Sequence, residues 1–119
     1  MNLALWVASG LLGLAMLAAG GTKLVTPRLE LMQKMHWAKE WSDGGVKLLG
    51  LAEVLGSVGL IVPQATGIAP VLTPVAAVCL VVLMLGAVKI HADLKEPVVA
   101  PAALALVGAF IAIGRFGVL

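Results

Sequence analysis

The chain has 119 residues, of which 61% are hydrophobic and only 12% are charged, and its mean hydropathy is +1.11. Soluble domains carry about 25% charged residues. A soluble protein of this size could not bury so much apolar surface. The composition therefore predicts a multi-pass protein of the cell membrane. The basic residues, which give a net charge of +2, cluster at the ends of apolar segments, so we expect no nucleic-acid partner.

Four apolar segments follow one another along the chain, and each approaches the ~20 residues that cross a bilayer as a helix. They are Leu3–Val25, Gly44–Pro63, Ala69–Ile90 and Val98–Val118. The first lacks the basic stretch that precedes a cleaved signal, so we expect it to remain as a helix. We expect Pro63 and the turn after it to end the second helix. Pro70 and Pro74 would lie in the first turns of the third helix, and Pro97 and Pro101 would open the fourth. The predicted fold is all-α: residues 1–119 form a single transmembrane domain, a four-transmembrane-helix bundle.

The connection from Thr26 to Asp43 predicts a short interfacial helix between the first two spans. Thr26 is a suitable N-cap and Pro27 a suitable first helical residue. One face of that helix would carry Leu31, Met35, Ala38 and Trp41. Trp37 and Trp41 would then lie at headgroup level. A polar loop without regular structure is the alternative.

The distribution of charge predicts the orientation in the membrane. Seven basic residues fall on one side of the predicted bundle, and Arg115 falls near the other. The seven are Lys23, Arg28, Lys34, Lys39, Lys47, Lys89 and Lys95. Because positive loops stay in the cytoplasm, we expect both charged loops to be cytoplasmic and both termini to be outside.

A short pattern occurs twice, near the inner ends of the first and third apolar segments. Gly20-Gly21-Thr22-Lys23-Leu24 and Gly86-Ala87-Val88-Lys89-Ile90 both read Gly-x-x-Lys-aliphatic. Since the two helices would run in the same direction, the pattern indicates either a parallel repeat of two hairpins or a coincidence of composition.

Glu53 lies near the middle of the second apolar segment. A carboxylate at that depth costs about 2.5 kcal/mol or more, so it persists only where it is paired, protonated or in use. Gly50, Gly56 and Ser57 lie at helical spacing from it and share its face, so Glu53 should point into the bundle. A buried pair that locks the bundle and a role as proton carrier or ligand contact both remain open.

Several cations could reach Glu53, and the sequence does not choose among Lys23, Lys47 and Lys89. His91 follows Lys89, and Asp93 could orient its ring. We expect a ligand cavity that opens toward the cytoplasmic half and is bounded by the first three apolar helices. Glu53 would lie at its deep end, with Lys23 and His91 nearer the mouth. Small residues would leave room for this cavity on the surrounding helix faces; they are Gly20, Gly50, Gly56 and Gly86.

Other chemistries find little support in the sequence. The single cysteine, Cys79, excludes a dithiol mechanism. A bis-histidine haem needs two histidines at membrane depth, whereas His36 is in a loop and His91 is at a helix end. No spacing typical of a metal site occurs, so we expect neither haem nor metal.

Several motifs together resemble the DoxX-like family of small four-helix membrane proteins, over nearly the whole chain. They are Gly20-x-x-Lys23-Leu24, Gly50-x-x-Glu53-x-x-Gly56, Met84-Leu85-Gly86-Ala87-Val88-Lys89-Ile90-His91 and Arg115 near the end. The resemblance implies a membrane or membrane-associated protein partner, or an accessory subunit linked to a quinone as cofactor. We also expect membrane lipid around the bundle, and a homo-oligomer stays open. The resemblance also points to Lys23, Glu53 and His91 as the residues of a ligand site.

Three functions follow as alternatives. The first is an accessory or assembly subunit, linked to a quinone-dependent oxidoreductase system; the short loops favour it. The second is a small proton-coupled transporter that works as a dimer, with Glu53 as the proton carrier. The third is a membrane enzyme acting on a lipophilic substrate, with Glu53 and His91 as acid and base.

Overall fold

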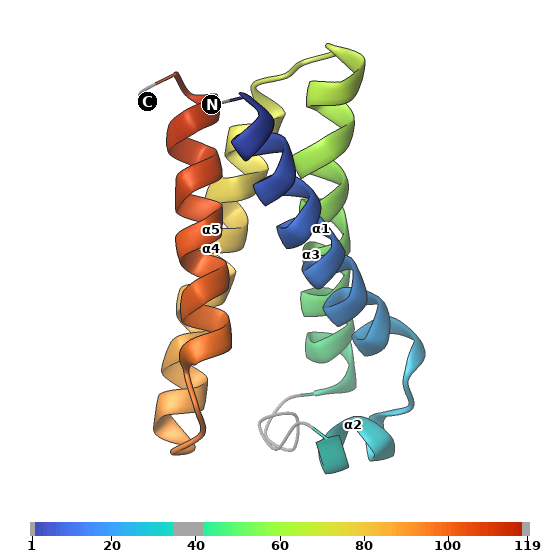
Figure 1. Cartoon of the computed structure of the whole chain (residues 1–119). Helices are drawn as coiled ribbons and strands as arrows, with labels where there is room; N and C mark the ends of the chain where they lie inside the picture. The colour runs from blue at the N-terminus through green and yellow to red at the C-terminus, as the bar shows by residue number, and fades with distance from the viewer. Residues whose placement is uncertain (1, 35–41, 118–119) are drawn as a thin grey trace.

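The computed structural model describes residues 2–34 and 42–117. These residues form five α-helices and no strand. The helices are α1 (Asn2–Val25), α2 (Arg28–Lys34), α3 (Asp43–Thr66), α4 (Leu72–Asp93) and α5 (Val99–Arg115). The four long helices alternate in direction, so α1 and α4 run the same way (Figure 1). Both termini lie at one end of the bundle, and α2 and the α4–α5 connection lie at the other.

The long helices confirm an all-helical membrane protein. Three of them, α1, the Gly44–Thr66 part of α3, and α4, are long and apolar enough to cross a membrane. Helix α5 is also apolar but has 17 residues, which corresponds to about 26 Å at the helical rise per residue. It packs along α4 and α1.

Several predicted helix boundaries differ from the structure: α4 continues to Asp93 instead of Ile90, and α5 ends at Arg115 instead of Val118. Two further differences lie next to prolines. Helix α3 does not end at Pro63 but continues to Thr66. A proline inside a helix lacks the N–H donor and crowds the carbonyl four residues earlier, but it does not prevent the residues after it from staying helical. Here the N–H of Gly67, at φ 73°, donates to the carbonyl of Pro63 and closes the helix three residues after the proline. Helix α4 begins at Leu72 instead of Ala69, because Ala69 has a φ of 49° and belongs to the preceding turn.

Helix α2 occupies the first part of the connection for which an interfacial helix is predicted. It begins at Arg28, directly after the Thr26-Pro27 pair. Its apolar face was predicted to extend to Met35, Ala38 and Trp41, which lie outside the described residues, as does Trp37. The placement of α2 at a membrane surface stays a prediction.

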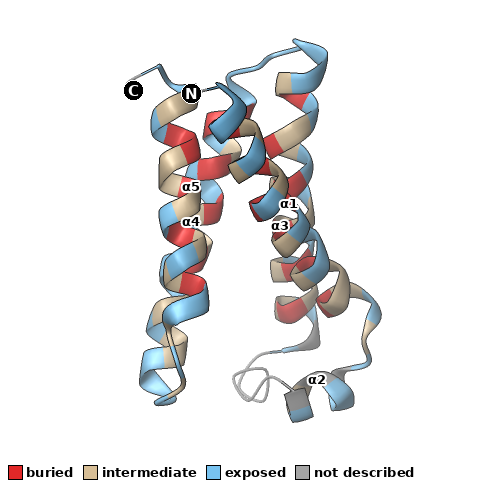
Figure 2. Cartoon of the chain, viewed as in Figure 1, coloured by how far each residue is buried: buried red, intermediate tan, exposed pale blue. Residues whose placement is uncertain are grey.

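Burial is distributed unevenly over the helices (Figure 2). Helices α1 and α3 carry buried residues along almost their whole length, from Leu5 to Lys23 and from Val46 to Pro63. In α4, by contrast, the buried residues stop at Met84. A hydrophobic core from all four long helices fills the half of the bundle near the termini; it includes Leu12, Leu60, Leu80 and Ile111.

A polar contact closes the terminal end of the bundle. Nη1 of Arg115 donates to Oδ1 of Asn2 at 2.7 Å, and the Arg115 guanidinium lies 5.3 Å from the centroid of the Trp6 ring. The second distance is that of a cation–π contact. These contacts join the last turn of α5 to the first turns of α1.

Candidate functional site

Helices α1 and α3 cross closely at two glycines. A Cβ placed on Gly20 would lie 2.5 Å from the carbonyl oxygen of Gly50, and one on Gly50 would lie 2.8 Å from that of Gly20. Both distances are too short for a side chain, so each glycine is required for the contact. The close approach of the two backbones brings the side chains that follow, Lys23 and Glu53, within reach of each other.

Lys23 and Glu53 form a buried ion pair between α1 and α3. Nζ of Lys23 lies 2.9 Å from Oε1 of Glu53, and the side chains are only 8% and 2% exposed. The second carboxylate oxygen, Oε2, is also buried and accepts no hydrogen bond from the described residues. Glu53 therefore has its charge compensated on one side and an unused acceptor on the other.

Lys47, considered above as a partner for Glu53, binds elsewhere. Its ammonium donates to the carbonyl oxygens of Lys23, Leu24 and Thr26 at 2.7, 3.0 and 3.1 Å. The last carbonyls of a helix have no partner within the helix, and a cation satisfies both their hydrogen bonding and the helix dipole. Lys47 thus fixes the end of α1 that carries Lys23.

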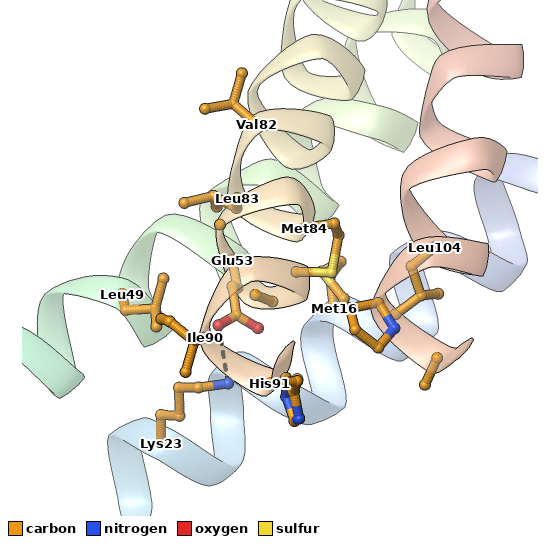
Figure 3. A pocket seen from close by; sticks show the side chains of 15 residues that line it. Met16, Lys23, Leu49, Glu53, Val82, Leu83, Met84, Ile90, His91 and Leu104 are labelled. Carbon is orange, nitrogen blue, oxygen red and sulfur yellow. Dashed lines mark ion pairs between the residues drawn. The ribbon is translucent and has the colours of Figure 1, made fainter. Parts of the chain in front are cut away.

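A cavity of about 350 Å³ lies beside the ion pair, and Lys23, Glu53 and His91 all line it (Figure 3). The cavity was expected to be bounded by the first three long helices, but α5 also contributes to its wall. The remaining lining residues are apolar: Met16, Ala19, Leu49, Val82, Leu83, Met84, Gly86, Ala87, Ile90, Ala100, Pro101 and Leu104.

His91 lies beside Glu96, a partner that the sequence did not predict. Nδ1 of His91 lies 3.6 Å from Oε1 of Glu96, whereas Asp93, the predicted partner, pairs with Lys89 at 2.9 Å. Lys89 and Asp93 stand one helical turn apart, so they meet on the surface of α4. The chain turns back after α4, and the N–H of Glu96 donates to the carbonyl of His91 at 2.8 Å. Only that turn brings Glu96 to the histidine.

The other two glycines of the predicted site differ in their surroundings. A Cβ on Gly56 would lie 2.6 Å from Cδ2 of Leu80, so α3 and α4 are in contact there. A Cβ on Gly86 would have no atom within 4 Å. Gly86 therefore lies on the cavity wall beside open space, just after Met84, the last buried residue of α4.

Comparison with known proteins identifies the chain by family. The model of the DoxX-like family matches residues 7–114. The chain has no significant match among curated proteins, nor among solved structures. The match includes Lys23, Glu53 and His91 and covers nearly the whole sequence, which confirms the resemblance read from the motifs. The chain therefore belongs to the DoxX-like family of membrane proteins.

Proposed function

We propose that the protein is an accessory subunit of a membrane oxidoreductase system, and that it binds a lipophilic molecule with a polar head, such as a quinone, in the cavity beside Glu53. One observation carries this proposal: a buried ion pair forms part of the wall of a cavity whose other lining residues, apart from His91, are apolar. Ligand sites typically combine apolar walls with a few polar groups that orient the ligand.

The size and position of the cavity support a lipophilic ligand. Its volume of about 350 Å³ lies within the usual range for small-molecule sites. Val82 lines it from the middle of α4 and is nevertheless 63% exposed. A residue exposed at the middle of a membrane-spanning helix faces lipid, so a ligand could enter sideways and leave its apolar tail in the bilayer.

The acid–base enzyme, the third function considered above, receives some support because Glu53 and His91 line one cavity. Each, however, already has an ionic neighbour, Lys23 for Glu53 and Glu96 for His91. The transporter alternative requires the Lys23–Glu53 pair to separate in each cycle. Binding requires neither the separation of these pairs nor a rearrangement of the helices, and we favour it for that reason.

The proposal includes a topology with four spans and both termini outside. Helix α5 would cross the membrane against α4, and α2 would lie at the cytoplasmic surface. The start of α3, the end of α4 and the α4–α5 connection lie at the same end of the bundle as α2 (Figure 1). These segments carry Lys47, Lys89 and Lys95, which is the arrangement that the positive-inside rule favours. A reporter active only in the cytoplasm should be inactive when fused to the C-terminus and active when inserted after Lys39. The reverse result would overturn this orientation.

Binding can be tested with decylubiquinone, a quinone with a short tail, and purified protein in lipid nanodiscs. We expect saturable binding to the wild type and a clear loss in Gly86→Leu, whose side chain would occupy the cavity. Gly10→Leu is the matched control, because a Cβ on Gly10 also meets nothing within 4 Å and Gly10 does not line this cavity. Equal binding to all three proteins, or to none, would contradict the proposed site.

The accessory role needs a separate experiment. Tagged protein solubilised gently from its native membrane should bring down an oxidoreductase subunit, identified by mass spectrometry. Extraction of the same sample should recover a lipophilic molecule from the wild type but much less from Gly86→Leu. Purification of the protein as a homodimer without any other protein would favour the transporter alternative.

A further inference from the structure

The carboxylate oxygen Oε2 of Glu53 bears on the chemistry of the ligand's head group. This oxygen is buried, on a side chain that is 2% exposed, and accepts no hydrogen bond from the described residues. Buried polar atoms in proteins nearly always have a partner, and leaving an acceptor without one is costly. The cost is greater for a carboxylate oxygen, which forms strong, charge-assisted hydrogen bonds.

The position of Oε2 associates it with the cavity. Oε1 faces Lys23, while the other oxygen is turned toward the side where Met16, Met84 and His91 lie (Figure 3). The two methionines line the cavity together with Glu53. Methionine side chains have three rotatable bonds and repack easily, so a small displacement of one would open Oε2 to a ligand.

We propose that the cavity selects a lipophilic molecule whose head donates a hydrogen bond, such as a hydroxyl, over one whose head only accepts. This inference rests on the proposed function. An ionised carboxylate accepts hydrogen bonds and donates none. A hydroxyl head would give Oε2 its missing partner, whereas a carbonyl head in the same place would meet it oxygen to oxygen.

A quinol and its quinone provide a matched pair of probes, because they carry the same substituents and tail. They differ by two hydrogen atoms, so that two carbonyl groups of the quinone are hydroxyl groups in the quinol. Decylubiquinol should bind the wild-type protein in nanodiscs about tenfold more tightly than decylubiquinone, under anaerobic conditions with dithionite present for the quinol. Tenfold corresponds to one hydrogen bond to a charged group. The dimethyl ether of decylubiquinol has no hydroxyl and should bind no better than the quinone.

Two variants test whether the preference for quinol over quinone depends on Glu53. In Glu53→Gln the acceptor is uncharged and an amide donor is added, so the affinities for quinol and quinone should come within about threefold of each other. Asp93→Asn is the control, since Asp93 is an exposed carboxylate paired with Lys89 and does not line the cavity. It should keep the tenfold preference. Should Glu53→Gln fail to fold, the ether on the wild type still tests the donor.

The outcomes separate this inference from the proposed function. Equal affinities for quinol, quinone and ether would overturn the donor selectivity, with a water molecule then the partner of Oε2, and would leave the ligand site intact. A preference that survives in Glu53→Gln would place the selectivity on another residue and would also overturn the inference. Failure of all three probes to bind would refute the proposed function itself, and the inference with it.

Discussion

Helices α1 and α4 run in the same direction and carry the same Gly-x-x-Lys-aliphatic pattern, but the pattern has different surroundings in the two helices. In α1, Gly20 touches the backbone of α3 and Lys23 is buried against Glu53. In α4, Gly86 borders open space, and Lys89 is 77% exposed and paired with Asp93 on its own helix.

The difference lies in the helix that each pattern faces. Helix α3 presents Gly50 and Glu53 to α1, which provides both a place for close approach and a charge to bind. The last part of α4, beyond Met84, contributes no buried residue, and the cavity lies against it. The same local pattern thus forms a buried contact on one helix and a cavity wall on the other.

The largest expected effect is a difference in stability between variants of Lys23 and of Lys89. Lys23→Met leaves Glu53 buried without its cation, which should cost about 3–5 kcal/mol of the free energy of unfolding. Lys89→Met removes an exposed pair one turn apart, worth only about 0.3–0.5 kcal/mol. Thermal unfolding of the two purified variants in detergent measures both losses of stability. Similar losses would show that the lysines at the ends of α1 and α4 are equivalent.

A double variant checks the reason for that loss. Replacing both members of a buried pair by apolar residues is often nearly neutral, because no charge is then left uncompensated. Lys23→Met with Glu53→Leu should therefore recover most of the stability that Lys23→Met loses. A double variant less stable than either single variant would indicate that Lys23 and Glu53 stabilise the bundle independently.

The next largest effect is the difference in stability between alanine substitutions at Gly20 and at Gly86. A methyl group on Gly20 would press on the carbonyl of Gly50, so α1 and α3 would have to separate. We expect Gly20→Ala to lose about 1–3 kcal/mol, the usual cost of overpacking. Gly86→Ala meets open space and should be neutral or gain up to about 1 kcal/mol from helix propensity. Thermal unfolding of the pair tests this, and a stable Gly20→Ala would contradict the close crossing.

The smallest effect concerns Lys47 and the end of α1. Lys47→Met removes the donor to three carbonyls and should cost about 1 kcal/mol, because water and lipid headgroups can replace part of the bonding. Hydrogen exchange should increase in residues 22–26 and change little at the end of α4. Unchanged exchange in residues 22–26 would mean that the helix end does not depend on Lys47.

Periodicity and length alone determined much of this protein. The apolar segments of about 20 residues predicted the long helices, since the bilayer sets that length. The spacing of Gly50, Glu53 and Gly56 predicted that the carboxylate points inward, because residues three and four apart share a helix face. The motifs around Lys23 and Glu53 also led to the right family.

Other features depended on contacts between residues far apart in the chain. Three lysines were candidates for Glu53, and only the crossing at Gly20 and Gly50 selects Lys23. Helix periodicity places a side chain on a face but does not say which helix, or which empty space, that face meets. For this reason the sequence could not distinguish Gly20 from Gly86, and only the packing of α1 on α3 and the end of the core at Met84 separate a buried ion pair from a cavity wall.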